Sequence, residues 1–312
     1  MSNGKNYREN EGGASLFMII PTIMLIIGYF IFPYEQYSNP PSWLQIPMFL
    51  GLFLLGIGFF LKKYDLGNFF KIFGWFVFSF YWATQPIKMY VTEGGDVFNA
   101  VVGVIGVYVL CYLAYHEWLS LVRKERISCL NWIAGASFFA GIIYFGIERT
   151  ALGEWLTAIV AEHSEWILNS IIGNSSVCGV DIYLDGIYAV SIIFACTALQ
   201  AMVVFVGMIG ALPKVDSKRK ILGLLITLVP IYILNLFRNA MVAFLVGKNI
   251  TSFNIAHNVL SKLGALITLI VLLVILIKLI PEIFDELLCL IDLPKRKGPI
   301  EQSLSEIFRR KK

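Results

Sequence analysis

The chain has 312 residues and a mass of 35.1 kDa; 58% of its residues are hydrophobic and only 15% are charged. Typical soluble proteins carry about 25% charged residues, so this chain lacks the polar surface that a globule in water requires. The mean hydropathy of +0.74 indicates a lipid environment, and excludes a cytosolic globule, a nucleic-acid-binding protein and a disordered chain. The formal charge of +4 is explained by the sorting of basic residues between the two membrane sides.

Eight apolar segments are each long enough to cross a bilayer as a helix, which needs about 20 residues. They cover residues 15–32, 43–61, 69–87, 97–115, 127–147, 187–212, 221–247 and 257–280. Between the fifth and sixth segments lies a polar stretch, 148–186, predicted as an external loop with an interfacial amphipathic part and a strand from Val180 to Leu184. The predicted fold class is an all-α polytopic membrane protein with about eight transmembrane helices.

Lysine and arginine residues set the predicted orientation, because cytoplasmic loops retain them. With the amino terminus inside, basic residues crowd the inner segments, whereas the outer loops hold only Lys88, Arg149 and Lys248. We therefore expect a multi-pass protein of the cell membrane with a cytoplasmic segment 1–14, a membrane domain 15–280 and a cytoplasmic tail 281–312. The tail's amphipathic pattern and basic end predict an anchor on the membrane surface. The first span has no small-residue cleavage site and is expected to remain as a signal anchor.

A charged residue, Arg238, lies within the seventh predicted span. A charge there costs at least about 2.5 kcal/mol on insertion scales, so we expect the side chain to face a protein cavity. Asn235 lies three residues earlier on the same helical face, and Asn239 follows Arg238 directly. The structural alternative is an arginine that snorkels to the interface or ties helices together.

Cys196 lies in the sixth predicted span, with Gln200 one helical turn later. A lone cysteine in an apolar helix usually serves as a small hydrophobic residue. Here, Arg238 is predicted at a similar depth on the next span, in the outer half of the bilayer. Because a nearby cation stabilises the nucleophilic thiolate, Cys196 is a candidate nucleophile.

His257 opens the eighth predicted span and is followed by Asn258. Of the other histidines, His116 is predicted to be cytoplasmic and His163 to be a solvated residue of the external loop. An imidazole exchanges protons near neutral pH, so His257 is a candidate general acid and base. The alternative is an interfacial histidine without a chemical role.

The remaining cysteines predict no disulfide framework, because Cys111 and Cys129 lie toward the inner side, Cys289 is cytoplasmic and only Cys178 is external. Cys178 is a rival nucleophile, although the neighbouring Asp181 and Asp185 would oppose a thiolate. One cysteine and one histidine beside a cation do not suit a metal, which usually takes three or four protein ligands. No metal and no cofactor is therefore predicted.

Three motifs in the last part of the chain resemble the exosortase and archaeosortase family of integral-membrane cysteine transpeptidases, the archaeal branch most of all. They are FACTALQAMVVFVG, PIYILNLFRNAMVAFLVG and AHN, within residues 187–265. The resemblance implies active-site spans within 187–280, with Cys196 as the nucleophile, Arg238 as the active-site arginine and His257 as the third member. Candidates to orient these residues or the substrate, with interhelical hydrogen bonding as their alternative role, are Gln200, Asn235, Asn239 and Asn258.

The resemblance also implies a substrate and a reaction. The substrate is a secreted surface protein whose carboxyl terminus carries a sorting motif, one transmembrane helix and a basic tail. Cleavage passes through a thioester acyl-enzyme, and a membrane lipid amine is the expected acceptor; water as acceptor would make a plain protease, a hydrolase. The alternatives from other classes are a small-molecule or anion transporter with Arg238 as its substrate site, and a scaffold subunit in which Arg238 and His257 only pack helices.

Overall fold

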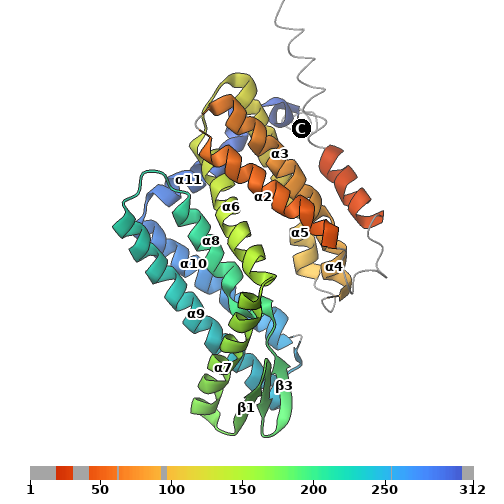
Figure 1. Cartoon of the computed structure of the whole chain (residues 1–312), viewed down its shortest axis with the longest axis vertical. Coiled ribbons are helices and arrows are strands. Elements are labelled where there is room, and N and C mark those ends of the chain that lie inside the picture. Colours follow the sequence, from red (N-terminus) through yellow and green to blue (C-terminus); the bar gives the residue numbers. More distant parts are fainter. Residues whose placement is uncertain (1–18, 31–41, 62, 93–96, 254, 304–312) are drawn as a thin grey trace, which may run out of the picture. The chain divides into compact units, whose positions relative to one another are not determined.

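The computed structural model describes residues 19–30, 42–61, 63–92, 97–253 and 255–303 (Figure 1). The described chain is mostly helical. It divides into two compact units, one made of Met1–Phe138 and Asp285–Lys312 and the other of Phe139–Phe284. The predicted cytoplasmic segment 1–14 and the last residues of the tail, 304–312, lie outside the described residues.

The first unit consists of apolar helices in which α2 packs on α3 and α3 packs on α5. The α2–α3 contact is close at Gly51, where an added Cβ would come within 2.7 Å of the Phe78 backbone nitrogen. Small residues allow helices to approach in this way inside a bilayer, where packing rather than the hydrophobic effect holds them together. The described helices of this part of the chain are Ile19–Phe30, α2 (Gln45–Phe60), α3 (Tyr64–Ala83), α4 (Gln85–Thr92), α5 (Val97–Arg123) and the start of α6 (Ser128–Glu148), with a 3-10 turn at Ser42–Leu44.

The second unit combines helices with a small antiparallel sheet of strand order β1-β2-β3. In Figure 1, α7 and α9 lie against the strands. Side chains of the two helices and the strands share one buried core that includes Val160, Ile182 and Ala243. The elements in chain order are α7 (Ala151–Ile172), β1 (Ser175–Cys178), β2 (Asp181–Leu184), β3 (Ile187–Ser191), η3 (Phe194–Thr197), α8 (Leu199–Gly210), α9 (Ser217–Gly247), the π-helical η4 (Ile255–Ser261) and α10 (Lys262–Leu279).

The stretch 148–186, predicted as a loop, therefore has a regular structure. The predicted strand Val180–Leu184 is confirmed by β2, and the predicted amphipathic part is the helix α7. β2 pairs with both neighbours, with Asp181 opposite Cys178 on one side and Ser191 on the other. The sheet adds a β element to a chain predicted to be all-α.

The segment predicted as the sixth transmembrane helix, 187–212, is not one helix. It begins with β3, continues through the 3-10 turn η3 and becomes α-helical only at Leu199. Its first residues are rich in β-branched side chains, which favour strands, and they pair with β2. A continuous apolar run does not distinguish a buried strand from a helix, so hydropathy alone gave a single span.

Four described helices are long and apolar enough to cross a membrane, as expected of a membrane protein. They are Val97–Arg123, Ser128–Glu148, Ser217–Gly247 and Ile255–Leu279. Shorter apolar helices occur at Ile19–Phe30, Gln45–Phe60 and Leu199–Gly210. The count of eight spans stays a prediction.

The predicted absence of a disulfide is wrong, because Cys129 and Cys289 are bonded to each other. Cys129 lies in the first turn of α6 and Cys289 in α11 (Glu282–Ile291), 160 residues later. The contact could not be predicted from the sequence, because the residues of the second unit lie between the two cysteines in the chain.

The tail also docks on α5 through polar contacts. Glu301 accepts hydrogen bonds from the hydroxyls of Tyr112 (2.6 Å) and Tyr115 (3.1 Å), and its carboxylate lies 3.3 Å from His116 Nε2. Arg296, in the 3-10 turn Leu293–Arg296, donates to the His116 carbonyl at 3.2 Å. A role of the tail as a membrane-surface anchor stays a prediction, and the structure adds this attachment to the helical unit.

Acid is expected to release the tail from α5. Burial raises the pKa of the Glu301 carboxyl, but hydrogen bonds from His116 and Tyr112 outweigh burial and hold the pKa at about 2, below the ordinary 4.5. A depressed carboxyl pKa means that the stabilisation is fully present above pH 4.5 and is lost as the pH falls toward about 2. Hydrogen exchange of residues 293–303 should therefore rise across this range.

The variant Glu301→Gln should show faster exchange in the tail already at neutral pH, with little further change in acid. Asp292→Asn is the matched control in the same tail, because the Asp292 carboxylate forms an exposed ion pair with Lys295. Equal exchange in wild type and Glu301→Gln at neutral pH would contradict the docking role.

Candidate active site

Cys196 lies in the short turn between strand β3 and helix α8. The residue is 6% exposed, and its N–H donates to the Ile193 carbonyl at 2.8 Å. Ala198 adopts a left-handed conformation with φ of 62°, and α8 begins at the next residue, Leu199. The cysteine thus precedes a helix N-terminus by three residues, where the helix dipole and free N–H groups favour negative charge.

Two amide side chains of α9 fix the backbone of Cys196. The Nδ2 groups of Asn235 and Asn239 donate to the Cys196 carbonyl at 2.8 Å and 3.1 Å. Both asparagines are buried, and Asn239 Nδ2 also lies 3.4 Å from the hydroxyl of Ser164 in α7. Because both amides reach the same carbonyl, α9 fixes the position of Cys196 together with the 3-10 turn.

Arg238 lies between these two asparagines on α9. Its Nη1 donates to Asn235 Oδ1 at 3.1 Å, and the Nδ2 group of the same Asn235 donates to the Cys196 carbonyl, so one amide connects the guanidinium to the cysteine. Its Nε is buried and has no hydrogen-bond partner within the described residues. A buried donor without a partner is costly, so the group is available to a ligand oxygen.

The geometry also indicates where an oxyanion would be stabilised. The N–H of Cys196 is already bonded to the Ile193 carbonyl, so this donor does not serve a reacting carbonyl oxygen. The free Nε–H of Arg238 is a donor that also carries positive charge. Arg238 can therefore assist both a thiolate and a tetrahedral oxyanion.

His257 lies in η4, the π-helical turn that leads into α10, and its ring stacks on Phe253 with 5.0 Å between centroids. η4 packs against α9, the helix that carries Arg238. π-helical turns are rare and frequent at functional sites, which agrees with a special role for this turn. The participation of His257 in the chemistry stays a prediction.

The remaining predicted site residues lie on other elements than Asn235 and Asn239. Gln200 is exposed in the first turn of α8. Its predicted helical spacing from Cys196 does not hold, because the left-handed Ala198 separates the two residues. Asn258 belongs to η4, and its side chain is outside the described part of the structure. Cys178, the rival nucleophile, is exposed on β1 opposite Asp181.

Two polar contacts near the site were not predicted from the sequence. Ser164 lies beside the Asn239 amide, and His163 Nδ1 lies 2.7 Å from the hydroxyl of Tyr232 on α9. His163 is exposed, as predicted for a loop residue, but it is bonded to a helix. Tyr232, Asn235 and Asn239 follow an i, i+3, i+7 pattern, and this polar stripe could have indicated the face of α9 that meets α7.

These features define a mostly helical membrane protein with a buried cysteine, an adjacent arginine and a set of amides that hold the cysteine in place. Among known proteins, the chain is similar to Archaeosortase A of Haloferax volcanii, with 24% identity over 219 residues, covering 64% of this chain and 70% of that protein. No family model and no solved structure matches the chain. The similarity agrees with the family suggested by the motifs.

Proposed function

We propose that the protein is a membrane-embedded cysteine transpeptidase that removes the carboxyl-terminal sorting signal of secreted surface proteins. The observation that carries the proposal is the buried Cys196 beside Arg238, with its backbone held by Asn235 and Asn239. The similarity to Archaeosortase A supports a sortase-like activity. The alternative of a small-molecule or anion transporter is not favoured, because a transporter needs neither a buried thiol nor two amides that hold the backbone of Cys196.

The first half-reaction forms a thioester. The Cys196 thiolate attacks the scissile peptide carbonyl carbon, and the carbonyl electrons move onto oxygen, where Arg238 stabilises the negative charge. Collapse of this intermediate breaks the carbon–nitrogen bond. His257 gives a proton to the departing amine, which leaves with the helix and basic tail of the substrate.

The second half-reaction transfers the acyl group to an acceptor. An amine of a membrane lipid loses a proton to His257 and attacks the thioester carbonyl, and the Cys196 thiolate leaves. The product is a surface protein held by lipid in place of its transmembrane helix. Water in the same role would release the protein by hydrolysis.

The proposed arrangement in the membrane follows the charge pattern. Both termini face the cytoplasm, the segment 148–186 lies outside and the active site lies in the outer half of the cell membrane. A substrate helix with a basic tail crosses the membrane with its carboxyl terminus in the cytoplasm. Its cleavage motif precedes the helix, so the motif lies at the external side, at the level of Cys196.

Interception of the acyl-enzyme tests the proposal. Membranes that contain the enzyme and a host surface protein are incubated with hydroxylamine, which attacks thioesters. Mass spectrometry should find surface proteins that lack the carboxyl-terminal helix and end in a hydroxamate. The variant Cys178→Ser should give the same product, since Cys178 lies on the exposed β1 strand. Trimmed proteins that never carry the hydroxamate would contradict a thioester intermediate.

A further inference from the structure

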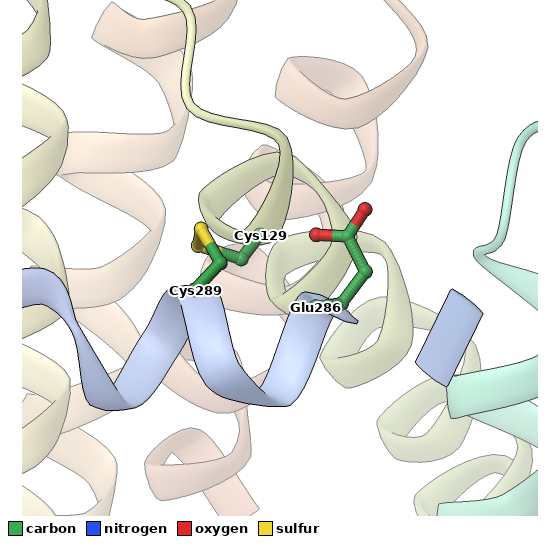
Figure 2. Close-up of side chains that lie close together, drawn as sticks. All are labelled: Cys129, Glu286 and Cys289. Carbon is green, nitrogen blue, oxygen red and sulfur yellow. A yellow bond between two sulfur atoms is a disulfide. The ribbon is translucent and has the colours of Figure 1, made fainter. Parts of the chain in front are cut away.

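A second group of reactive side chains lies outside the candidate active site, where α6 meets α11. Cys129 comes from the first turn of α6, while Glu286 and Cys289 lie three residues apart on one face of α11 (Figure 2). One ligand atom from each residue lies within 4.8 Å of the other two. Two sulfurs and a carboxylate converge here from two helices.

The carboxylate of Glu286 is incompletely satisfied. Its Oε2 is buried and has no hydrogen-bond partner in the described part of the chain, while the side chain of Ser128 hydrogen-bonds to the carboxyl group. A buried acceptor without a donor is costly and calls for an explanation. A cation at the sulfurs would satisfy this oxygen, and Ser128 would orient the carboxylate as outer-shell groups commonly do at metal sites.

The charge pattern predicts that the cluster lies on the cytoplasmic side. Cys129 follows the basic residues Arg123, Lys124 and Arg126, and Cys289 precedes the basic stretch 295–297. Cytoplasmic thiols are generally kept reduced. The structure joins the two sulfurs as a disulfide, but the reduced chain presents two thiols and a carboxylate at the same place.

We propose that the reduced form of this cluster binds a thiophilic divalent cation, Zn²⁺, through the sulfurs of Cys129 and Cys289 and the carboxylate of Glu286. Each thiol loses its proton to solvent as its sulfur bonds to the metal, and no electron is transferred. Three protein ligands leave one tetrahedral position for water. The metal form and the disulfide exclude each other, because each sulfur either bonds to its partner or acts as a thiolate ligand.

The position of the cluster gives the metal a structural role. Residues 129 and 289 flank the second unit, Phe139–Phe284, in the sequence. A metal that joins them closes a loop around the whole unit that carries Cys196 and Arg238. Such a link restricts the unfolded chain and holds α11 to α6. This inference does not depend on the proposed transpeptidase activity.

The test measures zinc in the full-length protein, purified in detergent under reducing conditions without chelator. We expect about one zinc per chain, protection of Cys129 and Cys289 from alkylation, and loss of that protection when a chelator is added. Cys129→Ser and Cys289→Ser should lose the zinc, and Glu286→Gln should bind it at least about tenfold more weakly because one ligand is gone.

Two matched controls should keep the zinc of the wild type. Asp285→Asn changes the exposed acid next to Glu286 on α11, and Cys111→Ser changes a buried free cysteine of the same unit. The zinc content of the wild-type protein tests the proposal even if the variants fail to fold. Zinc-free protein would overturn the proposal, whether its two thiols alkylate freely or the Cys129–Cys289 disulfide is recovered from cells quenched directly in alkylating reagent.

Discussion

Replacing Cys196 with alanine is expected to abolish processing, so that the host's surface proteins keep their carboxyl-terminal helices and gain no lipid adduct. Loss of a covalent nucleophile typically lowers the rate by at least about 10³-fold. The protein should accumulate normally, because Asn235 and Asn239 bond to the backbone carbonyl of residue 196, which alanine retains. Mass spectrometry of surface proteins, with immunoblots of the enzyme, measures both effects.

The control for this variant is Cys178→Ser, which changes the exposed cysteine of β1 and should leave processing intact. Unchanged processing in Cys196→Ala would show that the buried cysteine is only part of the core. A parallel fall in enzyme abundance and processing would instead point to a packing role.

Replacing Arg238 with glutamine is expected to lower processing by about 10² to 10³-fold, the usual cost of losing an oxyanion-stabilising donor. Glutamine removes the positive charge beside Cys196 but leaves a polar side chain next to Asn235. Arg238→Lys should rescue little, because an ammonium group lacks the planar set of donors that reaches Asn235 and a substrate oxygen together. Rates of trimming in membranes, normalised to enzyme amount, measure the loss.

Arg219→Gln provides the control on the same helix. Arg219, at the start of α9, is partly exposed and forms a hydrogen-bonded ion pair with Glu282 of α11. We therefore expect processing to persist in this variant. If Arg238→Gln abolished a transport activity while Cys196→Ala left it intact, the transporter alternative would replace the transpeptidase. If Arg238→Gln reduced only the amount of protein, the arginine would have a packing role.

One contact of the candidate site and one strand were predicted from the sequence for physical reasons. An arginine in an apolar helix is costly and therefore stands out, and the spacing of three residues correctly placed Asn235 on the same helical face, where it bonds to Arg238. Cys196 was singled out because it was predicted at a similar depth on the preceding segment. The strand β2 followed from its β-branched and aromatic residues between turn-forming residues.

The missed features depend on contacts between distant segments. The hydrogen bonds from Asn235 and Asn239 to the Cys196 carbonyl require a turn at Cys196, and the hydropathy of 187–212 is that of a helix. The Cys129–Cys289 disulfide requires α11 to return to α6, which no local pattern encodes. Periodicity reports which face of an element is buried, but it does not report which distant element covers that face.

The shortness of α8 has a consequence for the surrounding lipid. Its 12 residues give a length of about 18 Å, whereas the hydrocarbon core of a bilayer is about 30 Å thick. If α8 completes the sixth predicted crossing, lipid acyl chains beside it must compress, or water must occupy the remaining depth above the helix. The non-helical backbone around Cys196 does not depend on either adjustment, because Cys196 belongs to a buried core that side chains of α7, the sheet and α9 complete.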